Sequence, residues 1–131
     1  MLEALIGILI FSFGILGLVG LQAVSIRHIN DAQYRGEAVY LANSYVAQMW
    51  ADNPAGLVGK YLKGGTSYDA FRELVKRLPG AEKNTNEPTV DIQPGPSVTS
   101  TLVTVTVFWQ LPGEPDSARH NYSTTAVVGL N

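Results

Sequence analysis

The feature that most constrains this chain is an uninterrupted run of 23 uncharged residues, from Ala4 to Ile26. As an α-helix, such a run spans about 35 Å, which exceeds the ~30 Å hydrocarbon core of a bilayer. A buried core helix is disfavoured, because the rest of this short chain is too small to cover a helix that is apolar on every side. A cleaved secretory signal also fits poorly, because its apolar region is usually about 7–15 residues long and follows basic residues. We therefore predict that residues 1–26 form a transmembrane helix.

One acid and several glycines stand out within this predicted span. Glu3 is the only charged side chain in the first 26 residues. It is either a favourable first-turn acid at the positive end of the helix dipole or a carboxylate kept at the membrane for a function. The glycines either allow close helix packing or reflect the high glycine content of transmembrane helices. They are Gly7, Gly14, Gly17 and Gly20.

Helical character is predicted to continue beyond the membrane, to about residue 53. A polar segment, residues 27–37, follows the span, and apolar residues then recur at helical spacing as far as Trp50. Their apolar face is too broad for water, so we expect this part of the helix to pack against a core. The sequence Asn53-Pro54 ends the helix. Residues 27–131 are predicted to form one globular domain that includes this continuation of the helix.

A short second helix is predicted after a glycine-rich connector that follows Pro54. Thr66 or Ser67 is expected to cap this helix, and Pro79-Gly80 is expected to end it. Its apolar side chains recur at i, i+3, i+4 and i+7, which indicates one buried face. These side chains are Phe71, Leu74, Val75 and Leu78.

The last third of the chain is predicted to form strands. Apolar and hydroxyl side chains alternate between Val98 and Gln110, as in a half-buried antiparallel strand. Further strands are expected over residues 90–93 and 119–128, and a loop over 111–116. The predicted fold class is therefore α+β, with a small antiparallel sheet packed on the C-terminal half of the long helix. The expected domain core comprises Leu41, Met49, Trp50, Phe71, Leu78, Val103, Val105, Val107 and Trp109.

Charge and composition disfavour several function classes. The net charge of −2 leaves no basic surplus for nucleic acid, and the chain has no cysteine for a thiolate metal site or a nucleophile. His28 and His120 are not placed to share a metal ion, and no nucleophile-elbow spacing surrounds a serine. The loop acids are expected only to keep the surface hydrated; they are Glu82, Glu87, Glu114 and Asp116. We predict a protein that is not an enzyme and uses no cofactor or metal.

The order of these segments resembles the type IV pilin superfamily, in which an apolar N-terminal helix with a glutamate near its start leads into a small α+β domain. The match is closer to the minor pilins of the PilV type. Residues 15–22 are similar to their leucine- and glycine-rich run, and the helix end over 40–54 closes in Asn-Pro as theirs does. Residues 71–80 resemble their helix ending in Leu-Pro-Gly, and residues 103–109 resemble their valine strand ending in tryptophan.

The resemblance implies a non-catalytic role in assembly of a filament. Glu3 would be the family's glutamate, neutralised by the N-terminal amine of a neighbouring subunit, with Gly7, Gly14, Gly17 and Gly20 packed in the membrane or the filament core. It also implies a leader that ends in glycine and a mature, methylated phenylalanine two residues before Met1; a translation start at Met1 is the alternative. Gly20 stands near the position where many major pilins have a proline, and the paired C-terminal cysteines of major pilins are missing, which favours a minor subunit.

The expected protein is a minor pilin of the bacterial inner membrane, with a single span and a periplasmic C-terminal domain, that later joins the pilus filament or its tip. Its expected partners are other minor pilins and the major pilin, which it contacts through the N-terminal helix to prime assembly. A large tip adhesin is a further candidate partner, and nucleic acid is not expected. Two alternatives stay open: a pseudopilin of type II secretion and a membrane-anchored periplasmic binding domain.

Overall fold

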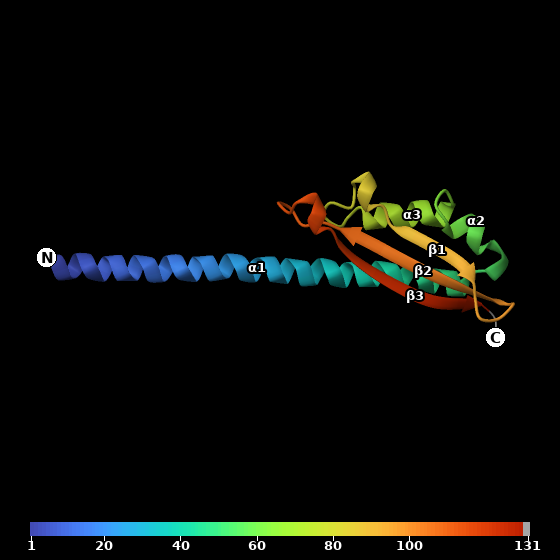
Figure 1. Cartoon of the computed structure of the whole chain (residues 1–131), viewed down its shortest axis with the longest axis horizontal. Coiled ribbons are helices and arrows are strands. Elements are labelled where there is room, and N and C mark those ends of the chain that lie inside the picture. The colour runs from blue at the N-terminus through green and yellow to red at the C-terminus, as the bar shows by residue number, and fades with distance from the viewer. Residues whose placement is uncertain (130–131) are drawn as a thin grey trace. The chain divides into compact units, whose positions relative to one another are not determined.

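The computed structural model describes residues 1–129 and has an α+β fold (Figure 1). A long helix, α1, runs from Leu2 to Ala51, and a three-stranded antiparallel sheet ends the chain. The chain divides into two compact units, Met1–Gln33 and Tyr34–Asn131. The first unit consists of the apolar part of α1 and the beginning of its polar segment. The second unit contains the rest of α1 and every other helix and strand of the described residues.

The long helix ends at Ala51, two residues earlier than expected. The side chains next to this end bond to nearby backbone groups: Asp52 accepts a hydrogen bond from the Asn53 amide at 2.9 Å, and Asn53 accepts one from the Ala55 amide at 3.0 Å. Short polar side chains that bond to the backbone in this way favour turns over a continued helix. The end of α1 is therefore set by Asp52 and Asn53, before Pro54 is reached.

The connector after Pro54 is more structured than the sequence indicates. It forms a 3₁₀ turn, Pro54–Gly56, and a short helix, α2, over Leu57–Tyr61. The expectation of an irregular loop was wrong, because it gave weight to the glycines and none to two large apolar residues. Leu57 and Tyr61 are both buried, so packing against the core holds α2 in place despite its short length.

The second predicted helix is present as α3, Thr66–Val75. It ends at Val75, before the predicted stop at Pro79-Gly80, and its start and one of its faces also differ from expectation. Gly65 is the N-cap residue, and no side chain caps the helix, so the predicted cap by Thr66 or Ser67 was wrong. A Cβ atom at Gly65 would lie only 2.3 Å from the Lys60 carbonyl oxygen, so the close approach of α2 requires glycine. Leu74, expected on the buried face, is 37% exposed.

The sheet consists of β1 (Thr89–Pro94), β2 (Ser100–Trp109) and β3 (His120–Gly129), with β2 in the centre. Its two faces differ, because side chains alternate along each strand. On the outer face the hydroxyls of Thr104 and Thr125 lie 3.1 Å apart, and that of Thr106 donates to Ser123 at 3.0 Å. The inner face carries the valines of β2 and is buried.

The core of the second unit lies between this inner face, the last turns of α1, and α2 and α3. Tyr45 of α1 is at its centre: its ring stacks on Phe71 with the ring centroids 4.0 Å apart. The Tyr45 hydroxyl donates a hydrogen bond to the Tyr61 carbonyl oxygen at 2.8 Å, and burial raises the pKa of this hydroxyl. The buried side chains include Leu41, Met49, Phe71, Leu78, Val103, Val105, Val107 and Trp109.

Trp50 is the exception among the residues expected in this core, because 55% of it is exposed. Its neighbour Met49 is fully buried, and consecutive residues of a helix point about 100° apart. Trp50 therefore projects to the side of the core contact. Assigning Trp50 to the core from its apolar character was a mistake that the helical period explains.

Candidate functional site

The N-terminal part of α1 is the largest apolar surface that the described chain leaves uncovered. Each large apolar side chain from Leu2 to Ile29 is exposed, and the least exposed of them, Ile15, has 45% of its surface free. Exposed apolar patches of this extent are rare in soluble monomers and mark contacts with lipid or protein. Unlike Leu41 or Met49 further along the same helix, these side chains receive no cover from the sheet.

The length and composition of this helix are sufficient to cross a membrane. Within its apolar run, Ala4 to Ile26, the hydroxyl of Ser12 donates to the Ile8 carbonyl oxygen at 2.7 Å. This bond satisfies the serine within the helix itself, as an apolar environment requires. The span therefore needs no polar partner at that position.

Glu3 and three of the four glycines share one face of the helix. Counting about 100° per residue, Glu3, Gly7, Gly14 and Gly17 fall within an arc of about 80°. Gly20 lies about 60° beyond Gly17, so the structure does not bring all four glycines together. This shared face was missed from the sequence because Glu3 and the glycines were interpreted separately, without comparing their angles around the helix.

Nothing in the described chain explains why these positions are glycine. A Cβ atom built at Gly7, Gly14, Gly17 or Gly20 meets no atom within 4 Å beyond the helix itself. Glycine in a helix costs up to about 1 kcal/mol relative to alanine, so the residues are unfavourable for the isolated helix. A neighbouring helix that packs against this face would benefit from its smooth surface.

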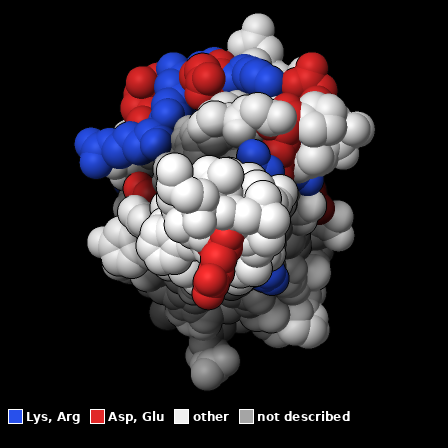
Figure 2. Space-filling model, turned by 90° about the vertical axis from the view of Figure 1, so that its left-hand side faces the viewer, with Lys and Arg blue, Asp and Glu red and all other residues white. Residues whose placement is uncertain are grey.

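The Glu3 carboxylate lies in the first turn of α1, where the helix dipole favours an acid. Within residues 1–129 it is exposed and forms no hydrogen bond or ion pair. Figure 2 looks onto the end of the molecule that lies at the left of Figure 1. The surface around the acidic group at the centre of this view is mostly white, that is, uncharged.

Three of the four loop acids, Glu87, Glu114 and Asp116, do more than hydrate the surface, which corrects the sequence-based expectation for them. Glu87 binds both Lys63 at 2.5 Å and Arg72 at 2.6 Å. The hydrogen bond from Lys63 lowers the pKa of the Glu87 carboxyl, and the charge of Arg72 adds to this effect. Glu114 accepts a hydrogen bond from the Leu111 amide at 3.2 Å. These acids fix loops, a role that only long-range contacts reveal.

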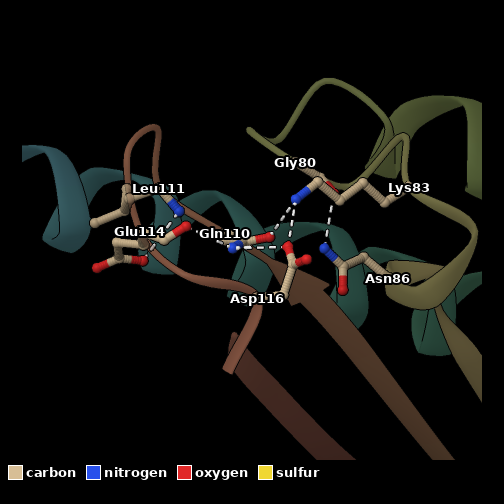
Figure 3. A network of polar contacts seen from close by, with 7 residues as sticks. All are labelled: Gly80, Lys83, Asn86, Gln110, Leu111, Glu114 and Asp116. Carbon is tan, nitrogen blue, oxygen red and sulfur yellow. Dashed lines mark hydrogen bonds and ion pairs between the residues drawn. The ribbon is translucent and has the colours of Figure 1, made fainter. Parts of the chain in front are cut away.

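Asp116 belongs to a polar network that joins the two loops beside the sheet (Figure 3). Lys83 donates to both Asp116 and the side-chain oxygen of Gln110, each at 2.8 Å, and the Gln110 amide donates to the Glu114 carbonyl oxygen at 2.9 Å. The hydrogen bond from Lys83 lowers the pKa of Asp116. Gln110 is almost fully buried, so the network satisfies its amide. This arrangement orders the loops and resembles no catalytic constellation.

The two histidines occupy different parts of the chain. His120 stacks on Trp109 with the ring centroids 5.7 Å apart, and its Nε2 atom lies 3.0 Å from Glu114. His28 lies in the polar segment of α1, within the first compact unit. Among residues 1–129, no three His, Cys, Asp or Glu side chains are grouped closely enough to hold a metal ion.

The uncovered face of α1 that begins at Glu3 is therefore the best candidate for a functional surface. Its chemistry suits contact with lipid or with other apolar helices. Comparison with protein-family models, with curated proteins and with solved structures finds no match to this chain.

Proposed function

We propose that this chain is a minor pilin, a non-catalytic subunit that helps to start a type IV pilus and takes its place in the filament or its tip. Its apolar helix anchors it in the bacterial inner membrane, with the globular unit in the periplasm. During assembly the same helix leaves the lipid and packs among the helices of other pilins. The observation that carries this proposal is the uncovered N-terminal part of α1, which continues without interruption into a helix that forms part of a folded core.

A simple anchor needs only length and apolar character, whereas this helix has two additional features. Its glycines lower helix stability and have no role within the described chain, and three of them share a face with Glu3. A filament of packed helices uses both features, since the small residues admit a neighbouring helix. The carboxylate then meets the N-terminal amine of a neighbouring subunit.

This pairing gives Glu3 a physical role in assembly. An unpaired carboxylate among apolar helices is costly, and so is an unpaired amine. Placing the two together neutralises both charges, which favours the register in which the amine of one helix lies beside Glu3 of the next. The acid thereby selects one longitudinal offset among the many that apolar contacts alone would allow.

The test is the substitution Glu3→Val in cells that make the native filament. Insertion and folding should be normal, because the change removes a charge from an apolar helix. Copies of the variant should fail to co-purify with other minor pilins, and pilus counts should fall by at least about tenfold, since loss of a buried pair costs a few kcal/mol. Glu3→Asp, which keeps the charge, is the matched control and should retain part of the activity.

Three outcomes separate the proposal from its competitors. Wild-type co-purification and wild-type pilus counts for Glu3→Val would leave Glu3 as a first-turn acid worth less than about 1 kcal/mol, and would contradict the proposal. Loss of protein secretion with normal pili would identify a type II secretion pseudopilin. Normal function after the helix is replaced by an unrelated span would indicate an anchored binding domain.

A further inference from the structure

A groove lies on the second unit where β1 begins, far along the chain from the Glu3 helix. It encloses about 450 Å³ and is lined by residues of the α2–α3 turn, the loop before β1 and the ends of β2 and β3. The rings of Tyr68 and Phe108 and the side chain of Pro88 make much of its wall apolar. Tyr68 is fixed there because its buried hydroxyl donates to the Pro88 carbonyl oxygen at 2.8 Å.

The charges around this groove do not balance. Glu87 is the only acid among its lining residues, and both of its carboxylate oxygens are occupied: Oε2 by Lys63 and Oε1 by Arg72. The remaining cation in the lining is Arg119. The groove and the residues that contact its lining thus contain three cations, Lys63, Arg72 and Arg119, and one acid, Glu87. Because the charge of Glu87 is already compensated, the electrostatic field of the groove favours an anion.

Arg119 is held in place by neutral groups alone among the described residues. Its Nη1 atom donates to the Thr85 carbonyl oxygen at 2.7 Å, and its guanidinium carbon lies 4.3 Å from the centroid of the Phe108 ring. A guanidinium has five N–H donors, and these contacts satisfy only part of them. Stacking on the ring fixes the plane of the group while its other N–H donors stay available, which is the geometry that binds a carboxylate through two parallel hydrogen bonds.

We propose that this groove binds an acidic side chain of a partner protein, with the carboxylate on Arg119 and the adjacent apolar part of the partner on Phe108 and Pro88. The groove is open to solvent along one side, so a small molecule would stay largely exposed in it. A side chain carried on a protein surface is held by contacts outside the groove as well. This site is separate from the Glu3 helix, and its role does not depend on the chain being a pilin.

The experiment uses the full chain in detergent micelles and two peptide probes that differ in one group. The acidic probe is acetyl-Leu-Glu-Leu-amide, and its control is the same peptide with glutamine in place of glutamate. Titration is followed by amide chemical shifts in NMR spectra. The acidic probe should shift the amides of Thr85, Val90 and Phe108 in a saturable manner, and should bind about tenfold more tightly than the glutamine probe.

Substitutions locate the binding site. Arg119→Gln should weaken binding of the acidic probe by about tenfold, and Arg119→Lys by less, because lysine keeps the charge and loses the paired donors. Lys63→Gln tests the electrostatic field of the groove and leaves in place the hydrogen bond from Arg119 to the Thr85 carbonyl oxygen. Lys76→Gln is the matched control, since Lys76 pairs with Glu73 outside the groove and its loss changes the net charge equally.

Several results would overturn the proposal. They are equal affinity for the two probes, equal weakening by Lys76→Gln and Arg119→Gln, and saturable shifts confined to residues outside the groove. A lack of saturable binding by the acidic probe to the folded wild-type chain would do the same. None of these results bears on Glu3→Val, so failure here and failure of the filament proposal are distinguishable.

Discussion

The two parts of α1, before and after Tyr34, both carry many apolar side chains, but these side chains have opposite surroundings. From Tyr34 to Ala51 the helix places one face in a core, where Ala38, Ala42 and Met49 are fully buried. Before Tyr34 its apolar side chains are exposed on every side. A continuous helix thus serves two purposes: its second half is stabilised by packing within the chain, and its first half requires cover from lipid or other chains. Apolar character alone does not distinguish these purposes; the pattern around the helix does.

The largest expected effect comes from the same substitution made in each half. Leu41 is 8% exposed and Leu21 is 70% exposed. Leu41→Ala should lower the free energy of unfolding of the globular unit by about 2–4 kcal/mol, because it leaves a cavity in the core. Leu21→Ala should change it by less than about 0.5 kcal/mol. Denaturant unfolding of the full chain in micelles, followed by circular dichroism, measures both.

Assembly should respond in the opposite order, which sharpens the comparison. Leu21→Ala removes apolar area from the uncovered half and should reduce recovery of the chain with its partners, whereas folded Leu41→Ala should retain that surface. Similar losses of stability for both variants would mean that the uncovered half also packs within its own chain.

Alanine substitution is expected to affect the stability of the globular unit at one glycine, Gly80, and not at another, Gly14. Gly80 has a positive φ of 67°, and a Cβ atom there would lie 3.0 Å from both Cβ and the carbonyl oxygen of Gln110. Gly80→Ala should therefore destabilise the globular unit by about 1–2 kcal/mol. Gly14→Ala meets open space and favours the helix by up to about 1 kcal/mol, so the folded unit should be unaffected.

Thermal unfolding of the two variants in micelles provides the measurement. The melting temperature should fall for Gly80→Ala and stay the same for Gly14→Ala. A fall for Gly14→Ala would show that this glycine contacts the rest of the chain, which would remove one support for packing between subunits.

The smallest expected effect is a dependence of stability on acid, confined to the packed unit. Hydrogen bonds from Lys60 and from the Asn53 amide, and a further one from Tyr61, lower the pKa of Asp52 from 3.8 to about 2. Because the folded-state pKa is the lower one, the contribution of Asp52 is present above pH 3.8 and is lost as the pH falls towards 2. In the Asp52→Asn variant, the unfolding midpoint should therefore decrease less than in the wild type between pH 3.8 and about 2.

Lys60→Gln is the companion variant, because it removes the group that contributes most to the lowered pKa. Like Asp52→Asn, it should reduce the decrease of the unfolding midpoint between pH 3.8 and about 2. Unfolding midpoints measured at closely spaced pH values compare the three proteins. Three superimposable profiles would mean that the exposed pair at the end of α1 contributes nothing to stability.

Periodic features of the sequence were predicted well, because regular elements leave regular patterns. The valines of β2 alternate with threonines and lie on the buried face, and the strand expected over 98–110 is found at Ser100–Trp109. The long apolar helix at the N-terminus was equally clear. The shared face of Glu3 with Gly7, Gly14 and Gly17 was also present in the sequence and needed only a count of helical angles.

The remaining features depend on contacts between residues distant in sequence. Trp50 is exposed because Met49 takes the core position, and α2 forms because Leu57 and Tyr61 reach the same core. The groove at β1 brings Lys63 and Arg119 together across 56 residues of chain, which no local pattern indicates. Tertiary structure decides these points, and intrinsic propensity does not.

The two outer strands of the sheet differ in how they meet solvent. β1 is short, carries Asp91 and has Pro88 just before it and Pro94 at its end, which are features that discourage pairing with another strand. β3 has ten residues and contains no proline, lysine or acid, and among the described strands it pairs only with β2. Its outer edge is therefore a template on which further strands can add. If the apolar helix is removed to make a soluble fragment, this edge is expected to limit the concentration at which the fragment stays monomeric. Asn121→Lys, at an exposed position of β3, should raise that concentration.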